Sequence, residues 1–451
     1  MPRHLLYLIV FIEGFCSLGA EVIALRRLVP HVGSAIVVTA PTIGLFLLAL
    51  ALGYAAGARV ADRFTAVVGR NFVVSALLAG VGLSRLAVDG LFGAVQPVWL
   101  AYLLFMALVL CPLARLLGQT VPVLTNLMKH MRTGEASGMA LYWSTLGSFL
   151  GSVSLSLLVM QWLGVSAAVL VCAVWLLAGS LLLAPRNLSA WPAWAQALAV
   201  AVASVAMHLA PGPQVLDTAY ADYEVRPVEL PGQTNPRGFM VNHSLASLMD
   251  DSEPPHYARY LQRLRQILLD ELALADSDIL VLGAGGFTLS HREPANRYTY
   301  VDIDPAIRTL AERHFLNSPI RGSFVVDDAR RFVRTTTQRF AAVVVDVYSS
   351  HTSIPGHLVT QEFWADTRRT LAPGGVLLIN LILDSQLQSA YARNLLATIE
   401  SVYGRCGVEV LHKTRPQSNV IVSCQASGHP APGTPYTDER NTADLDMANA
   451  H

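Results

Sequence analysis

Six long apolar stretches constrain the fold of this chain more than any other feature of its sequence. They cover roughly residues 5–25, 35–56, 72–92, 98–117, 138–160 and 165–184. A helix of about 20 apolar residues crosses the hydrocarbon core of a bilayer. Apolar residues make up 53% of the 451-residue chain and charged residues only 14%, and the apolar excess lies almost entirely before residue 210. The sequence therefore predicts a transmembrane helical domain at 1–210, with six to seven spans, followed by a soluble half.

A glycine cluster marks the functional centre of the soluble half. The apolar run 279–282 stops at Gly283, Gly285 and Gly286, and a second apolar run, 298–301, ends on Asp302. A buried parallel strand reads as a continuous apolar run, and glycines at its end let the backbone approach a ligand closely. An acid at the tip of the next strand can accept hydrogen bonds from ribose hydroxyls. This pattern indicates the nucleotide-binding edge of a Rossmann-like sheet.

The rest of the soluble half divides into three parts. Short alternating runs in 211–256 predict a small antiparallel β subdomain. Strand and helix patterns then alternate over 257–425, with strands expected at 278–283, 298–302, 323–326, 340–346, 376–383, 408–412 and 419–424. This alternation predicts a doubly wound parallel sheet. The polar tail at 426–451 is rich in Pro and Gly and is expected to be disordered.

Acidic residues stand at the ends of several predicted strands. They are Asp302 and Asp304, Asp327 and Asp328, and Asp346. In open α/β sheets, ligands bind outside the carboxyl ends of the strands. A row of carboxylates suits hydroxyl and amino groups and repels phosphate, and the sequence contains neither a P-loop lysine nor a metal-ligand cluster. We therefore expect a site for a nucleoside that carries a cation, with no metal.

Charge and cysteine content narrow the choice of partners. The net charge is zero and the chain has no basic block, so nucleic acid is not an expected partner. The five cysteines are Cys16, Cys111, Cys172, Cys406 and Cys424, and no CxxC pattern is present. They are expected to be small apolar filling residues rather than disulfide partners or metal ligands.

Several motifs of the soluble half occur in the order found in one known family. They are ILVLGAGG at 279–286, YVDIDP at 300–305, VDDAR at 326–330, VVVDVYSS at 343–350 and LAPGGVLLIN at 371–380. From about Asp217 to Cys424 the chain resembles the spermidine synthase (polyamine aminopropyltransferase) family, whose catalytic domain has a class I methyltransferase-like Rossmann fold. GLFLLALALGYAAGARVADR at 44–63 resembles the membrane domain that is fused to some members.

The resemblance implies transfer of an aminopropyl group from decarboxylated S-adenosylmethionine to a small amine acceptor. The other expected partner is the lipid bilayer, and a second copy of the chain in a homodimer is left open. Asp346 would be the catalytic base. The implied cofactor-binding residues form the glycine loop and the two strand ends beside it: Gly283, Ala284, Gly285, Gly286, Asp302, Ile303, Asp327, Asp328 and Ala329. The resemblance further implies that Tyr348, Ser349, His256 and Tyr257 contact the acceptor.

Two positions depart from the family pattern. The family's glycine loop contains an Asp that holds the aminopropyl ammonium, whereas this loop reads GAGGF, with Gly286 or Phe287 in that place. The second acid of the family's DxxD motif, which holds the acceptor amine, is replaced by Ser349. Acids from the preceding segment are candidates to compensate, namely Glu224, Asp250 and Asp251. A methyltransferase that uses intact S-adenosylmethionine is therefore the alternative function.

The side of the membrane on which the soluble half lies depends on the number of spans. Basic residues gather at the side of the N-terminus, which predicts a cytoplasmic N-terminus. The stretch 191–209 is a weaker seventh candidate because it contains Gln196 and His208. Six spans in the cell (inner or plasma) membrane, with a cytoplasmic catalytic domain, are favoured because the inferred cofactor is made inside cells. Glu13 and Glu21, which lie inside the first span, keep open a third function, a transport or sensor protein with a nucleoside-binding regulatory domain.

Overall fold

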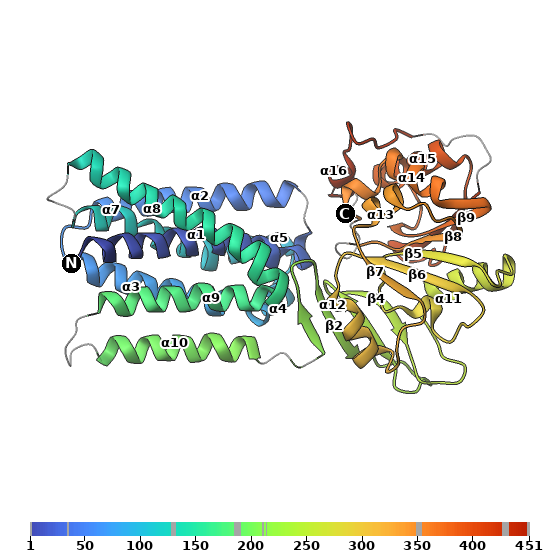
Figure 1. The fold of residues 1–451 in the computed structure, drawn as a ribbon, viewed down its shortest axis with the longest axis horizontal. Helices are drawn as coiled ribbons and strands as arrows, with labels where there is room; N and C mark the ends of the chain where they lie inside the picture. The colour runs from blue at the N-terminus through green and yellow to red at the C-terminus, as the bar shows by residue number, and fades with distance from the viewer. Residues whose placement is uncertain are drawn as a thin grey trace. The chain divides into compact units, whose positions relative to one another are not determined.

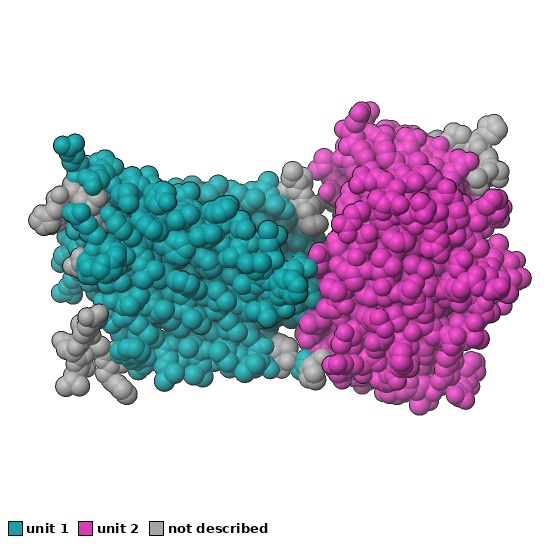
Figure 2. Space-filling model, in the orientation of Figure 1, with its two compact units in different colours: residues 1–213, 217–219 teal, residues 214–216, 220–451 magenta. Residues whose placement is uncertain are grey.

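The computed structural model describes residues 2–33, 36–127, 132–184, 191–209, 212, 214–348, 354–425 and 433–448. The chain divides into two compact units, coloured separately in Figure 2. Unit 1 contains residues 1–213 and 217–219, and unit 2 contains residues 214–216 and 220–451. The division agrees with the change in composition near residue 210.

Unit 1 is a bundle of helices (Figure 1). The helices are α1 (Arg3–Val32), α2 (Ile36–Ala58), α3 (Phe64–Leu77), α4 (Arg85–Ala94), α5 (Val98–Phe105), α6 (Cys111–Gly118), α7 (Thr120–Thr125), α8 (Thr133–Ser154), α9 (Met160–Leu183) and α10 (Trp191–Leu209). Helix α1 packs against both α8 and α9. Glycines allow the close approach of α1 and α8, because a Cβ at Gly147 would lie 2.2 Å from the Phe11 carbonyl oxygen. Small residues play this part in helix pairs that lack a hydrophobic driving force.

Within the part of the chain that the structure describes, six helical segments are long and apolar enough to be candidate membrane spans. One of them, Gly134–Leu183, has 50 residues and is interrupted at Gly164, whose φ of 84° is not helical. A straight helix of that length would measure about 75 Å, more than twice the roughly 30 Å of a hydrocarbon core. Gly164 lies within the range of α9, and its kink separates the first residues of α9 from the rest of that helix. In Figure 1, α8 and α9 are separate helices of the bundle. The predicted weaker stretch, 191–209, is among the candidates as Pro192–Leu209.

The span predicted at 72–92 is wrong in its position. The apolar helix covers Phe64–Gly82 instead. Ser84 then begins α4, since its side chain accepts a hydrogen bond from the backbone nitrogen of Ala87. Arg85 and Asp89 form an i,i+4 ion pair on this short helix, at 3.2 Å. The polar cap Ser84 and the charged pair Arg85–Asp89 therefore mark the end of the apolar segment and the start of a separate short helix.

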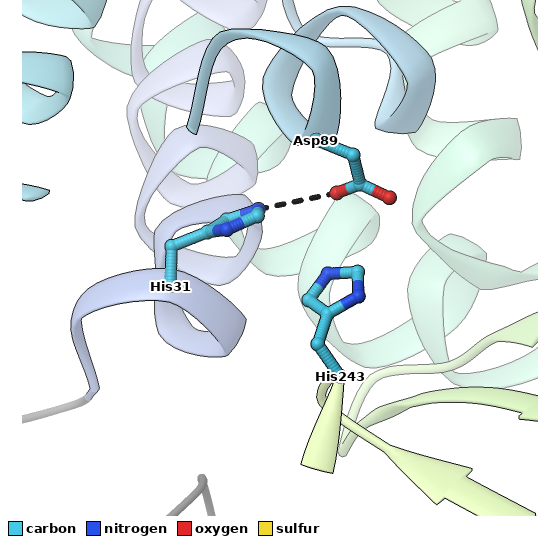
Figure 3. A group of neighbouring side chains, drawn as sticks. All are labelled: His31, Asp89 and His243. Atoms are coloured by element: carbon cyan, nitrogen blue, oxygen red, sulfur yellow. Dashed lines mark hydrogen bonds and ion pairs between the residues drawn. The ribbon is translucent and has the colours of Figure 1, made fainter. Parts of the chain in front are cut away.

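Residues 217–219 are held at the end of the bundle where α1 ends. Asp217 accepts hydrogen bonds from the guanidinium of Arg27, at 2.9 Å, and from the backbone nitrogen of Ser166, at 3.1 Å. Arg26 donates to the carbonyl oxygens of Thr218 and Ala219. At the same end of α1, His31 Nε2 lies 3.1 Å from Asp89 Oδ1 (Figure 3).

Arg3 begins α1, so it lies at the other end of the bundle from these contacts. Within unit 1, the chain therefore emerges from the bundle at the end opposite to its N-terminus.

Unit 2 begins with a four-stranded sheet of order β1-β2-β3-β4. The strands are β1 (Val215–Asp217), β2 (Asp222–Pro227), β3 (Arg237–Val241) and β4 (Ser244–Met249). The β2-β3 and β3-β4 pairs are antiparallel, as the alternating sequence predicts. Tyr223 and Phe239 belong to the same hydrophobic cluster as Ile279 of the larger sheet. The small sheet thus shares its core with the domain that follows it.

The larger sheet has seven strands in the order β10-β11-β9-β8-β5-β6-β7. They are β5 (Asp278–Leu282), β6 (Arg297–Asp302), β7 (Ser323–Val326), β8 (Phe340–Val345), β9 (Leu371–Asp384), β10 (Gly407–Val410) and β11 (Gln417–Cys424). Strands β9-β8-β5-β6-β7 are parallel neighbours, and β11 runs antiparallel to both β9 and β10. Counted from β5, this is the order 3-2-1-4-5-7-6 with the seventh strand reversed, the Rossmann-like fold of methyltransferases and spermidine synthases.

Helices cover the large sheet. They are α11 (Arg259–Gln266), α12 (Ala306–Leu310), α13 (Ala329–Thr335), α14 (Gln361–Thr370), α15 (Ala390–Tyr403) and α16 (Ala443–Ala448). Val281 and Val344 belong to one core cluster, whereas Leu280 and Val343 belong to the other. Alternate residues of a strand point to opposite faces. The continuous apolar runs that predicted buried strands therefore fill two cores, one on each side of the sheet.

Two expectations for the C-terminal region require correction. Cys406 and Cys424 form a disulfide, so they are not free apolar filling residues. The predicted disorder of the tail, 426–451, does not hold for residues 433–448. Tyr436 is buried there, and its hydroxyl and the side chain of Asn394 both donate to Asp446 of α16. One buried aromatic ring and a shared acceptor hold this polar segment to the domain. Residues 426–432 lie outside the described residues.

Candidate active site

A cavity of about 310 Å³ opens at the carboxyl ends of the parallel strands of unit 2. Its volume is within the range of small-molecule sites. Neighbouring strands of the large sheet each provide residues that line this cavity. They are Asp328 and Ala329 after β7, Asp302 and Ile303 at β6, Gly283 and Gly285 after β5, Asp346 and Tyr348 after β8, Asn380 and Ile382 on β9, and Asn419 on β11. The predicted nucleoside residues and the predicted base are thus brought together in one cavity.

The glycine loop lies directly against the strand that carries the predicted base. Gly283 has a φ of 87°, a region that favours glycine. A Cβ at this position would stand 2.1 Å from the carbonyl oxygen of Asp346. No larger residue fits there without moving the β8 end. The loop and Asp346 therefore form one rigid edge.

Asp302 ties the end of β6 to the glycine loop. Its Oδ2 accepts a hydrogen bond from the Ala284 nitrogen at 2.9 Å, and its Oδ1 accepts one from the Asp304 nitrogen at 3.1 Å. Burial raises the pKa of Asp302 above the usual aspartate value, and these two hydrogen bonds act against that rise. Asp302 also lines the cavity, so these two hydrogen bonds fix the orientation of a carboxylate at the cavity surface.

The two neighbouring acids after β7 have different surroundings. Asp328 lines the cavity, caps α13 by accepting from the Arg331 nitrogen, and lies 3.3 Å from His357 Nε2. Asp327 does not line the cavity and forms an ion pair with the Arg331 side chain. Of the predicted loop residues, Ala284 and Gly286 also lie behind the cavity wall, and Gly286 donates its backbone N–H to Ser247. Of the three acids predicted to bind the cofactor, Asp302 and Asp328 therefore line the cavity in the structure, and Asp327 does not.

Asp346 lines the cavity and is held by a chain of two side-chain amides. Asn380 Nδ2 donates to Asp346 Oδ1 at 2.8 Å, and Asn419 Nδ2 donates to Asn380 Oδ1 at 2.9 Å. The register explains this arrangement. Val345 pairs with Ile379, so that the next residues, Asp346 and Asn380, are neighbours at the same level.

Burial raises the pKa of Asp346 to about 6, and hydrogen bonds from Asn380 and from Tyr260 of α11 act against this rise. The Ala246 carbonyl oxygen is the other acceptor within reach of the Tyr260 hydroxyl, whose single hydrogen serves one of the two acceptors at a time. A carboxylate with a pKa near the working pH, oriented by an amide, is suited to accept a proton from a reacting group. Among the predicted site residues, Asp346 has the surroundings of a general base.

The predicted acceptor residues are only partly brought to the cavity. Tyr348 lines it and donates its hydroxyl hydrogen to the Asn380 carbonyl oxygen at 2.9 Å. His256 and Tyr257 do not line it: His256 pairs with Asp250 at 2.8 Å, and the Tyr257 hydroxyl lies 2.8 Å from His291 Nδ1. Ser349 lies outside the described residues.

The acids considered as compensating residues also lie away from the cavity lining. Asp251 pairs with Arg237 at 2.8 Å, and Asp250 accepts from Ser252 and His256, which lowers its pKa to about 2 despite burial. Glu224 lies on β2 beside the lining residue Tyr223 and is not itself part of the lining. The partners of Asp250 and Asp251 thus hold these two acids away from the cavity lining, and Glu224 is absent from that lining.

Sequence reasoning missed Tyr260, Asn380 and Asn419. Asn380 ends the quoted motif LAPGGVLLIN, so its position at a strand end was a usable signal. Asn419 lies on the antiparallel strand β11, where it pairs with Ile382 of β9, and it belongs to no recognisable sequence motif. Tyr260 comes from a helix that precedes the glycine loop in the chain, and only the packing of α11 brings it to Asp346.

Comparison with known proteins gives three matches of interest. The polyamine aminopropyltransferase of Vibrio vulnificus is 31% identical over 134 residues, which cover 28% of this chain and 43% of the relative, less than half of its length. Polyamine aminopropyltransferase 1 of Streptomyces coelicolor is 26% identical over 417 residues, covering 84% of this chain and 75% of the relative. A crystal structure of a probable spermidine synthase from Corynebacterium glutamicum is 20% identical, covers 53% of this chain and 94% of that one, and has a TM-score of 0.41.

No protein-family description matches the chain. The Streptomyces match covers more of the chain than either unit contains, so it extends over the helical bundle as well as the α/β unit. The predicted resemblance to the polyamine aminopropyltransferase (spermidine synthase) family is therefore confirmed by sequence comparison.

Proposed function

We propose that this protein is a membrane-anchored transferase that moves the aminopropyl group of decarboxylated S-adenosylmethionine to a small amine. The observation that carries the proposal is the position of Asp346. It is held by Asn380 beside the glycine loop, in the same cavity as Asp302 and Asp328. A nucleoside on the β6 and β7 side and an amine on the β9 side would meet at this carboxylate.

The chemistry needs little from the protein beyond placement and a base. The amine nitrogen forms a bond to the carbon beside the sulfonium as the carbon–sulfur bond breaks, and the sulfur keeps that electron pair in neutral methylthioadenosine. The nitrogen must lose a proton, which Asp346 can accept because burial brings its pKa to about 6. Holding the two reactants in line supplies much of the remaining acceleration.

Methyl transfer from intact S-adenosylmethionine is the second candidate, and the glycine loop favours it. The loop GAGGF has no acid to hold an aminopropyl ammonium. Phe287 is buried instead, and its ring packs against Tyr300 and Phe324, with centroids 4.9 Å and 5.4 Å apart. The Phe287 side chain therefore packs in the hydrophobic core, and other residues must discriminate between the two donor molecules.

Calorimetric titration of the purified full-length protein distinguishes the two donors. We expect decarboxylated S-adenosylmethionine to bind at least tenfold more tightly than the intact form, because the row of carboxylates repels the additional carboxylate of the intact molecule. Methylthioadenosine, the neutral product, should bind as well. Tighter binding of intact S-adenosylmethionine would move the assignment to methyl transfer, and no binding of any of the three would contradict a nucleoside site.

We further propose that unit 1 spans the membrane and that unit 2 follows on the non-cytoplasmic side. The support is within unit 1: the contacts of Asp217 with Arg27 and Ser166 hold the emerging chain at the end of α1 opposite to Arg3. Basic residues mark the Arg3 end as cytoplasmic. The disulfide of Cys406 and Cys424 suits an oxidising compartment, because cytosolic thiols are kept reduced. This proposal is the alternative to the cytoplasmic placement that a count of six spans predicts.

Reporter fusions in a bacterium test this orientation. Alkaline phosphatase fused after His451 should be active and a fluorescent protein at the same place dark, because the first folds only outside the cytoplasm. Fusions after Asp62, between α2 and α3, should give the reverse and serve as the control. A fluorescent C-terminal fusion would contradict the orientation and restore the cytoplasmic placement, where the donor is made.

A further inference from the structure

The acids of the cavity stop at β8. Asp328 follows β7, Asp302 ends β6 and Asp346 follows β8, whereas β9 and β11, on the other side of β8, provide Asn380, Ile382 and Asn419. Neighbouring strands are about 4.8 Å apart, so the acceptor side of the cavity extends roughly 10 Å beyond Asp346 without an acid from the sheet. The row of acidic side chains that line the cavity thus ends at Asp346, where the amine would react.

We infer that the acceptor is a primary amine with an uncharged tail, such as an amino alcohol or an alkylamine, and not a diamine. The inference rests on the proposed aminopropyl transfer and specifies its acceptor. The reacting amino group lies at Asp346, and the tail lies between the β9 and β11 side chains and Tyr223 and Tyr348, which also line the cavity. A diamine would bring a second ammonium into this region.

Among the described residues of unit 2 that line this side of the cavity, none is a carboxylate that could pair with a second ammonium. An alkylammonium has a pKa of about 10, so the second amino group stays protonated at neutral pH. Transfer of a charged group out of water is costly unless an opposite charge pairs with it. The next acid along β9, Asp384, does not line the cavity. It accepts from the backbone nitrogens of Gln388 and Ser389, which hold it at the start of α15. Residues 349–353, which follow Tyr348 in the sequence and lie outside the described residues, read Ser-Ser-His-Thr-Ser and include no acid.

The amides are suited to a neutral tail. Both polar atoms of Asn380 are used, one on Asp346 and one on Asn419. Asn419 donates through its Nδ2, and within the described residues its side-chain oxygen accepts no hydrogen bond. That oxygen is an acceptor for the hydroxyl of an amino alcohol. Ile382, its cross-strand partner, provides apolar surface for the methylene groups.

The test uses the full-length protein with decarboxylated S-adenosylmethionine and measures release of methylthioadenosine. The acceptors are matched in length: 1,4-diaminobutane, 4-aminobutan-1-ol and pentylamine. We expect kcat/KM for the better of the two uncharged-tail amines to exceed that for the diamine at least tenfold. An Asn419→Asp variant adds the missing carboxylate and should shift the ratio at least tenfold toward the diamine. Glu409→Gln changes a charge on β10 outside the cavity and should leave the ratio unchanged.

Each outcome has a separate meaning. Wild-type preference for the diamine overturns the acceptor inference while methylthioadenosine release still supports aminopropyl transfer. Absence of release with every amine, despite donor binding, contradicts the proposed function itself and the acceptor inference with it. If Asn419→Asp does not fold, the wild-type ratio alone decides, because it needs no variant.

Discussion

Replacing Asp346 by asparagine is expected to lower kcat/KM at least a hundredfold, while the affinity for methylthioadenosine changes less than about threefold. A positioned general base contributes roughly 10²- to 10⁴-fold, and an amide of the same shape cannot accept the proton. Asparagine can keep the hydrogen bond from Asn380 through its oxygen, so the edge of β8 should not move. Steady-state release of methylthioadenosine and calorimetry on the same preparation measure both effects.

The same substitution should stabilise the protein at high pH. Burial raises the pKa of Asp346 from 3.8 to about 6, so the folded state binds the proton more tightly than the unfolded state. The stabilisation from this group is complete below the unfolded pKa and is lost as the pH rises through about 6. The full shift would correspond to about 3 kcal/mol, and water in the cavity reduces it to about 1–2 kcal/mol. Asp346→Asn should therefore raise the melting temperature at pH 8 and have little effect at pH 4.

The pH dependence of wild-type activity follows from the same pKa. For the free enzyme, kcat/KM should fall below about pH 6 as Asp346 becomes protonated. Wild-type kinetics in the Asp346→Asn variant would show that Asp346 is a structural residue at the end of β8. Equal melting temperatures for the two proteins at pH 8 would contradict the raised pKa of Asp346. Asp327→Asn is the matched control for both measurements, since Asp327 pairs with Arg331 outside the cavity.

The parts of the fold that the sequence predicted correctly are those fixed by local patterns. Buried parallel strands need continuous apolar runs, so the segments at 278–283 and 340–346 were found within a residue of β5 and β8. Asp302 and Asp346 could be identified because each follows such a run directly. The glycine loop was found for the same reason, since Gly283 has a positive φ and a backbone contact that exclude a Cβ.

What the sequence did not predict depends on contacts between distant segments. Asn419 reaches Asn380 only because β11 inserts antiparallel between β9 and β10. The disulfide forms because the β10-β11 pairing brings Cys406 near Cys424, and neither residue belongs to a cysteine motif. Asp327 and Asp328 are adjacent in the chain, and only the start of α13 decides which of them faces the cavity.

Asp302→Asn is expected to weaken the binding of methylthioadenosine by roughly 10- to 100-fold. Each oxygen of Asp302 accepts a backbone N–H, one from Ala284 in the glycine loop and one from Asp304. An asparagine has one acceptor oxygen, so its NH₂ group would face one of these two donors. Hydrogen bonds to a charged group contribute about 1.5–3 kcal/mol, and one of them would be replaced by a repulsive contact.

Asp302 is also the group that would accept hydrogen bonds from the ribose of the ligand, so the substitution acts on the loop and on the ligand together. Asp327→Asn changes an acid on the adjacent strand end without touching the cavity and should bind methylthioadenosine within about twofold of wild type. Calorimetry on the two variants therefore separates a local effect at β6 from a general loss of negative charge. Equal weakening in both would assign the effect to overall charge, and unchanged affinity in Asp302→Asn would place the nucleoside elsewhere in the cavity.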